Sequence, residues 1–249
     1  MTSTTETGHG KNVTLLEQVL SICTGFGTDY APVKVFITLP SITTKHTESA
    51  DAVLQVQNKY AAIVIKVDKR SAEFQDISEL ATKIKNAVIA SDAPNEFLPN
   101  IVEFVRKLQG KRAKTVKLQI TPTTPEAEAH KKISVSQLSY DMIINHFSQI
   151  VELLSAQTLY NPNEDELKVI TLKEKLNKMK AANTAVMAAN TDLGKARNER
   201  DKIMYHPETG IIPMANDIKA YVKSKFGGVS AQFKMLSKIQ FKKPKKVFI

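Results

Sequence analysis

The chain has 249 residues, of which 42% are hydrophobic, a formal net charge of +10 and a sequence pI of about 9.5. This length is enough for a substantial core in one or two domains. No stretch of about 18 apolar residues is present, and residues 1–11 lack the basic and apolar regions of a signal peptide, so neither a transmembrane helix nor secretion is predicted. Cys23 is the only cysteine, so no intrachain disulfide can form, and we expect a cytoplasmic protein.

The composition favours a helical fold. Gly and Pro occur only nine and ten times and Trp is absent, whereas sandwiches and barrels need many Gly- and Pro-containing turns. We therefore predict a mainly α protein, an elongated antiparallel helical bundle in which two helices are much longer than the others. The alternative is a pair of compact three-helix domains joined by a connector.

The N-terminal part of the chain predicts a tail, a helix and an extended segment. Residues 1–11 are polar and predict a flexible tail, and residues 12–24 carry an apolar stripe that predicts a helix ending at Gly25. Residues 33–40 are rich in β-branched side chains, which predicts a short strand or an extended arm.

A long helical pattern follows and closes the first predicted unit, residues 12–110. Between about 48 and 90, apolar residues recur at steps of three and four, which predicts helix with a break near Arg70. Pro99 lies in the first turn of a shorter helix that ends before Gly110.

The second predicted unit covers residues 133–228 and repeats this order. A connector, residues 111–132, contains an alternating segment at 115–121 that predicts a short β segment. A helix at 133–157, a long helix from 164 to about 205 and a short helix ending before Gly227 follow. The C-terminal arm, residues 229–249, is basic and apolar, and its part 237–249 is a further candidate for a short β segment.

Two short segments suggest an internal duplication. Residues 98–110 and 212–227 both open with an apolar residue and Pro, continue amphipathically, become basic and stop at Gly. Each follows a long helical pattern, so a helical unit is predicted to occur twice. Convergence of two amphipathic patterns is the alternative.

Residue patterns of common active sites are missing from the sequence. No Gly-rich phosphate loop occurs, and the five His residues have no metal-ligand spacing. Neighbouring carboxylates at 164–166 are explained by the start of a helix, and those at 199 and 201 by an alternating-charge helix face. We therefore predict no enzyme activity, no cofactor and no metal site.

The second long helix contains an unusual set of polar residues. Asn183 and Asn190 are seven residues apart and share a helix face, among many Ala residues. One interpretation is a moderately polar helix that packs closely through Ala. The other is buried Asn pairs that fix the register of a helical assembly.

The favoured function is a non-enzymatic structural or protein-interaction role, with self-assembly through helix faces and the C-terminal arm. The arm carries more apolar surface than a solvated tail needs, and the segment around 35–37 offers an edge for strand addition. Packing of the arm on its own bundle as a cap is the alternative. The predicted interaction residues are Phe233, Ile239, Phe241, Val247, Phe248, Ile249, Val35 and Ile37.

The alternative function is binding of a polyanion such as nucleic acid. Most of the positive charge is Lys rather than Arg, which more often solvates helix faces than reads bases, so this role is less favoured. The residues that would neutralise phosphates are Lys111, Arg112, Lys114, Lys242, Lys243, Lys245 and Lys246.

The sequence Tyr160-Asn161-Pro162-Asn163-Glu164, together with the basic C-terminal tail, resembles a group of uncharacterised bacterial hypothetical proteins of similar length. The resemblance covers mainly residues 160–245. It implies a mainly helical protein and brings no activity, ligand or catalytic residue with it.

Overall fold

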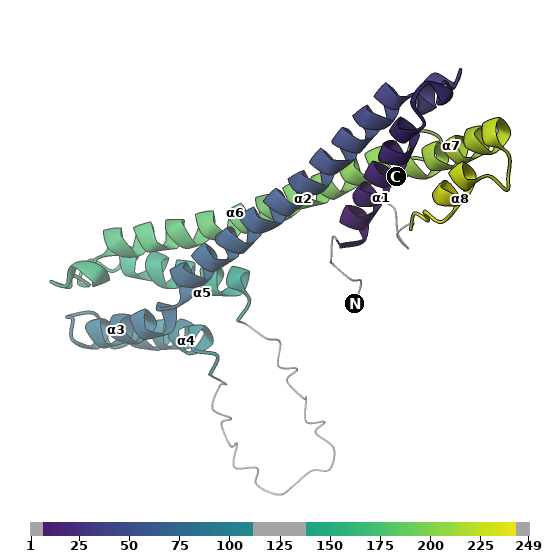
Figure 1. Cartoon of the computed structure of the whole chain (residues 1–249). Coiled ribbons are helices and arrows are strands. Elements are labelled where there is room, and N and C mark those ends of the chain that lie inside the picture. The colour runs from purple at the N-terminus through teal and green to yellow at the C-terminus, as the bar shows by residue number, and fades with distance from the viewer. Residues whose placement is uncertain (1–6, 112–137, 243–249) are drawn as a thin grey trace, which may run out of the picture. The chain divides into compact units, whose positions relative to one another are not determined.

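The computed structural model describes residues 7–111 and 138–242 (Figure 1). In these ranges the chain is mainly α-helical and forms no strand, which confirms the predicted fold class. Three short 3-10 helices, η1 (Gly27–Asp29), η2 (Val35–Ile37) and η3 (Asp165–Leu167), lie in the connections. The α-helices are α1 (Thr7–Gly25), α2 (Leu39–Phe74), α3 (Ile77–Ile89), α4 (Leu98–Leu108), α5 (Tyr140–Ala156), α6 (Val169–Tyr205), α7 (Ile211–Phe226) and α8 (Ala231–Ser237).

The chain forms two compact units, and each contains segments from both halves of the sequence. Unit 1 consists of Met1–Val64 and Ala188–Ile249, so it combines α1 and the first part of α2 with the last part of α6, α7 and α8. Unit 2 consists of Ile65–Met187 and combines the end of α2, α3 and α4 with α5 and the beginning of α6. The compact units therefore do not coincide with the predicted segments 12–110 and 133–228, because α2 and α6 each contribute to both.

Both long helices begin after the same kind of turn. The Tyr30 hydroxyl donates to the carbonyl of Ile37 at 2.7 Å, and the Tyr160 hydroxyl donates to the carbonyl of Leu167 at 3.0 Å. In each case the accepting residue ends a 3-10 helix, and a long α-helix starts two residues later. A buried tyrosine thus closes the turn that precedes α2 and α6.

The predicted strand at residues 33–40 is wrong. This segment contains η2, and α2 already begins at Leu39, with Pro40 in its first turn where a missing backbone N–H is harmless. Val33 and Val35 are 97% and 75% exposed. Their β-branched side chains suggested a strand, but the Tyr30 hydrogen bond and packing of η2 on α7 decide the backbone conformation.

Helices α3 and α7 correspond to each other, in a different register from the predicted duplication. Helix α3 packs on η3 in unit 2, and α7 packs on η2 in unit 1, so α3 and α7 occupy equivalent places. Their buried residues match without a gap: Ile77 with Ile211, Ala81 with Ala215, Ile84 with Ile218 and Val88 with Val222. The predicted pairing of 98–110 with 212–227 is therefore wrong, because Pro near the start and Gly after the end are signals that many helices share.

Each unit has its own hydrophobic core. In unit 1, α1, α7 and α8 contribute apolar residues that include Leu16, Ile218 and Leu236, all fully buried. In unit 2, residues from α3, α4, α5 and the start of α6 surround Phe147, which is also fully buried. These two cores hold the short helices against the ends of the long ones.

Three smaller predictions are also corrected. Residues 7–11 of the predicted tail belong to α1, and the long helical stretch breaks at Gln75 and Asp76 rather than near Arg70. In the predicted β segment 237–249, the described residues up to Lys242 form no strand. The predicted segment at 115–121 lies outside the described residues.

Candidate interaction groove

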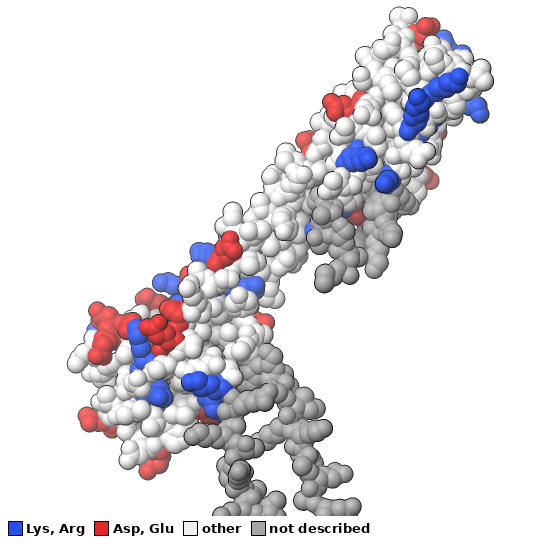
Figure 2. Space-filling view, turned by 60° about the horizontal axis from the view of Figure 1, so that its bottom comes forward, with Lys and Arg blue, Asp and Glu red and all other residues white. Residues whose placement is uncertain are grey.

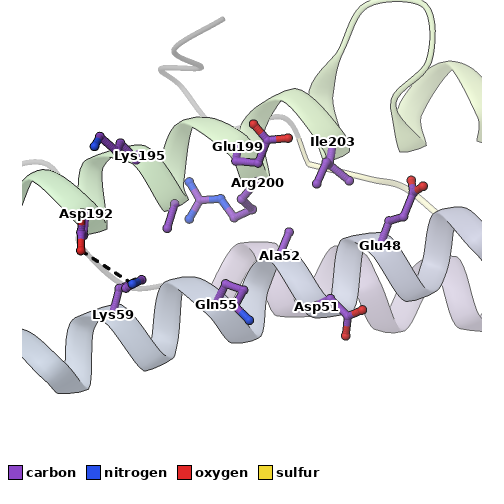
Figure 3. A pocket seen from close by; sticks show the side chains of 11 residues that line it. Glu48, Asp51, Ala52, Gln55, Lys59, Asp192, Lys195, Glu199, Arg200 and Ile203 are labelled. Atoms are coloured by element: carbon purple, nitrogen blue, oxygen red, sulfur yellow. Dashed lines mark ion pairs between the residues drawn. The ribbon is translucent and has the colours of Figure 1, made fainter.

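A groove of about 640 Å³ lies in unit 1 between the first part of α2 and the last part of α6 (Figure 3). Its floor contains Ala52 from α2 and Ala196 and Ile203 from α6, and Ala52 is buried. The small alanine side chains leave space between the two helices. The remaining lining residues are Glu48, Asp51, Gln55, Lys59, Asp192, Lys195, Glu199 and Arg200.

The charged side chains of this rim are partly separated by sign along the groove. Glu48 and Asp51 lie at one end, Glu199 lies nearer the middle, and Lys59 and Lys195 lie at the other end together with Asp192 (Figure 3). The two helices run antiparallel, so residues early in α2 lie opposite residues late in α6. The groove therefore has an apolar floor, an acidic end and a basic end.

Two of these rim charges already have a partner in the chain. Lys59 pairs with Asp192 across the groove at 3.7 Å, which reduces the net charge of the basic end. Glu48 pairs with Lys45, one turn earlier on α2, at 3.1 Å. The Lys59–Asp192 bridge is exposed on both sides and holds its side chains only weakly, whereas in the other bridge Lys45 is 15% exposed and Glu48 is 47% exposed.

A buried ion pair lies behind the rim. The Arg200 guanidinium donates through Nε and Nη2 to the same oxygen of Asp201, at 2.9 and 2.7 Å, and both side chains are at least 94% buried. A charged Arg or Asp buried alone would be costly, and here each compensates the charge of the other.

The described part of the C-terminal arm packs on unit 1 of the same chain. Ile239 is 7% exposed in the unit 1 core, and Phe233 and Phe241 pack against it. Lys219 of α7 donates to the Ile239 carbonyl at 2.5 Å, and burial lowers the pKa of this amine. This is the arrangement of the alternative in which the arm caps its own bundle.

The arm is also held at its end by α1. The Asn12 side chain is buried, accepts from the Lys242 N–H at 3.2 Å and donates to the Lys242 carbonyl at 2.8 Å. Its amide also donates to the Tyr205 hydroxyl. Val247, Phe248 and Ile249 lie outside the described residues.

The two predicted interaction residues near the first turn differ in accessibility. Ile37 is 3% exposed and belongs to the unit 1 core, so it offers no surface to a partner. Val35 is 75% exposed. The structure brings Ile37 and Ile239 into the same core, whereas Val35 faces solvent.

The predicted polyanion residues do not assemble into a described patch. Lys111 and Lys242 are exposed and belong to different units. On the face shown in Figure 2, basic and acidic side chains are interspersed. The other five residues, Arg112, Lys114, Lys243, Lys245 and Lys246, lie outside the described residues.

Asn183 joins a polar network inside unit 2. Its Oδ1 accepts from Nη1 of Arg70 at 3.1 Å, and its Nδ2 donates to Asp141 at 2.7 Å. The Arg70 guanidinium also lies 3.9 Å from the ring centre of Tyr140. Asn183 is thus buried, as one interpretation of the sequence required, but its described partners are Arg70 and Asp141 rather than another Asn.

The metal-ligating side chains and the single thiol of the described residues give no sign of a metal centre or a reactive cysteine. No three His, Cys, Asp or Glu side chains in residues 7–111 and 138–242 are placed to hold a metal ion. Burial raises the pKa of the Cys23 thiol to about 11, which disfavours its reactive thiolate form. Among the helices of the described ranges, none is long and apolar enough to span a membrane.

Sequence reasoning did not identify the groove. Its lining comes from two helices far apart in the sequence, and its charged residues have the alternating pattern of an ordinary solvated helix face. The only available signal was the small side chains at Ala52 and Ala196, which do not identify a groove without knowledge of which helices pair. No family model, curated protein or solved structure matches this chain.

Proposed function

We propose that this protein is a non-enzymatic structural protein that associates with a second copy of itself through the groove of unit 1. The observation that carries the proposal is the separation of charge along an apolar groove. Glu48 and Asp51 lie at one end with Glu199 nearer the middle, and Lys59 and Lys195 exceed the single carboxylate, Asp192, at the other end.

A second copy fits this charge distribution. When two grooves face each other and run in opposite directions, a two-fold axis lies across them, and the acidic end of each copy meets the basic end of the other. Parallel grooves would instead place like charges together. The complementarity thus favours one of the two symmetric arrangements, which is how rim charges fix the register of an interface.

The floor of the groove supports the same arrangement. Small residues such as Ala52 and Ala196 allow helices to approach closely, and Ile203 supplies apolar area that association removes from water. Two antiparallel helices from each copy would then form an antiparallel four-helix arrangement, in which the charged rims surround an apolar centre.

Charge reversal on α6 tests this interface. Lys195 and Glu199 are exposed and lie one turn apart on the rim of the groove, with Lys195 nearer the basic end. Each single reversal, Lys195→Glu or Glu199→Lys, is expected to weaken the dimer by roughly tenfold, since about 0.7 kcal/mol per charge contact is lost twice in a two-fold interface. The double variant, which exchanges the two charges, restores complementarity and should return the affinity towards that of the wild type.

Sedimentation velocity over a range of protein concentrations gives the dissociation constants. Lys180→Glu is the matched control, because it makes the same charge change on an exposed residue of α6 that does not line the groove. A protein that is monomeric at all concentrations would refute the proposal. So would a dimer that responds equally to Lys180→Glu and to Lys195→Glu.

A further inference from the structure

The duplication shows where unit 2 lacks a side chain that unit 1 has. In unit 1, Tyr221 of α7 covers the turn that follows Tyr30: the two rings meet edge to face, with centroids 5.3 Å apart. The Tyr221 hydroxyl accepts a hydrogen bond from the backbone N–H of Ala31 at 3.0 Å. The aromatic ring of Tyr221 thus packs over the turn and covers it.

In unit 2 the equivalent helix position is Ala87. The ungapped match between α3 and α7, which pairs Ile84 with Ile218 and Val88 with Val222, places Ala87 where Tyr221 stands. A pocket of about 760 Å³ is present there, and Ala87 and Asn161 line it. Because unit 2 has the small Ala87 where unit 1 has Tyr221, open space remains between α3 and the turn.

The rest of the turn is retained in unit 2. Pro162 and Leu167 line the pocket and take the places of Pro32 and Ile37. The backbone N–H of Asn161 takes the place of the Ala31 N–H, and none of the described residues accepts a hydrogen bond from it. The backbone N–H that donates to the Tyr221 hydroxyl in unit 1 thus has a counterpart in unit 2, but the tyrosine side chain has none.

The ion pairs beside the turn use equivalent positions of the two helices. In unit 1, Lys34 of the turn pairs with Asp217 of α7 at 2.5 Å. In unit 2, Glu166 of the turn pairs with Lys83 of α3 at 3.1 Å, and Lys83 is the position that matches Asp217. The helix and the turn are linked by an ion pair in both units, although Glu166 lies two positions beyond Glu164, the residue that matches Lys34.

We propose that this pocket of unit 2 binds the side chain of a tyrosine from a partner polypeptide, in the place that Tyr221 occupies in unit 1. The ring packs over Ala87, and its hydroxyl accepts from the Asn161 N–H. Carboxylates outnumber cations around the pocket, with Asp92, Glu164 and Glu166 against Lys83. The tyrosine therefore has basic neighbours, as Tyr221 has in Lys219 and Lys223. The inference is independent of the groove in unit 1.

Amide chemical shifts of the 15N-labelled full chain test the site. Three probes are titrated: p-cresol, N-acetyltyrosinamide and the blocked pentapeptide Lys-Ala-Tyr-Val-Lys with the sequence of residues 219–223. We expect saturable shifts at Ala87 and Asn161, with a dissociation constant on the order of 1 mM for p-cresol and a lower one for the pentapeptide. Toluene, which lacks the hydroxyl, should bind at least several-fold more weakly than p-cresol.

Two substitutions give matched controls. Ala87→Tyr fills the pocket from within the chain and should abolish the p-cresol shifts, and Ala87→Leu should weaken them if the tyrosine variant does not fold. Tyr221→Ala opens the equivalent place in unit 1 and should produce new p-cresol shifts at Ala31. Absence of saturable shifts at Ala87 and Asn161, or shifts that persist in both Ala87 variants, would overturn the proposal. Tighter binding of p-cresol than of the pentapeptide would overturn the polypeptide as the source of the ring.

Discussion

Tyr30 and Tyr160 hold the same position in the two halves of the chain. Each is buried, and each donates its hydroxyl proton to the carbonyl of the residue seven positions further on. Burial raises the pKa of Tyr160 to about 12 and also raises that of Tyr30, so both hydroxyls stay protonated donors at neutral pH. These hydrogen bonds fix the 3-10 turns that precede α2 and α6, and through them the start of both long helices.

Removal of the Tyr160 hydroxyl should destabilise the turn without leaving a cavity in the core. We expect Tyr160→Phe to lower the free energy of unfolding by about 1–2 kcal/mol, because the carbonyl of Leu167 loses its donor while buried. Urea unfolding followed by circular dichroism measures the change. Tyr60→Phe is the control, since Tyr60 is 56% exposed, and it should leave the stability unchanged. Equal stability of the Tyr160 and Tyr60 variants would contradict a structural role for this hydrogen bond.

His146 should make stability depend on pH. It is 4% exposed, neither ring nitrogen has a hydrogen-bond partner among the described residues, and burial together with Lys107 lowers its pKa, an effect that Glu103 partly offsets. The unfolded state, with a pKa near 6.5, then binds more protons than the native state as the pH falls. The contribution of His146 to stability is thus present above about pH 6.5 and is lost as the solution becomes more acidic.

Replacement of His146 by leucine should remove this pH dependence. We expect the melting temperature of the wild type to fall more between pH 7.5 and pH 5.5 than that of His146→Leu, as measured by differential scanning calorimetry. The variant should not be less stable at acidic pH, because leucine leaves no buried nitrogen without a partner. Parallel pH profiles for the two proteins would show that the imidazole does not titrate differently on folding.

The Asn183 network should be cooperative. We expect Asn183→Leu to destabilise the protein by about 1–3 kcal/mol, because Arg70 and Asp141 each lose a hydrogen bond in a partly buried place. A second variant, Arg70→Met, and the double variant complete a double-mutant cycle in urea unfolding. The two single effects should sum to more than the double effect. Strict additivity would mean that the two residues do not interact.

The described part of the C-terminal arm should behave as an intrachain cap. Ile239→Ala is expected to lower the free energy of unfolding by about 2–4 kcal/mol, the usual cost of removing a buried isoleucine side chain. Met235→Ala, at a residue 46% exposed on the same arm, is the control and should have a much smaller effect. A change in oligomeric mass without a change in thermal stability would instead place Ile239 in an interface between copies.

Local patterns predicted the helices well where the pattern and the packing agree. Pro99 and Gly110 bracket α4, and Gly227 follows α7 with φ of 91°, a conformation that glycine adopts more readily than other residues. Segments where a distant tyrosine or helix decides the conformation were mispredicted. Residues 33–40 were assigned to a strand because Val33 and Val35 favour one, whereas contacts with Tyr30 and α7 select a 3-10 helix.

Local patterns alone predicted that this protein is mainly helical and that two helices are much longer than the others, because hydrophobic periodicity is a local property of the chain. Only the tertiary structure decided which parts of the two halves pack together. Apolar faces of similar width can pair in several ways, and the pairing depends on buried contacts between residues far apart in sequence, such as Asn12 with Lys242. The groove at Ala52 and Ala196 and the pocket at Ala87 exist only because of that pairing, so no single segment could have revealed them.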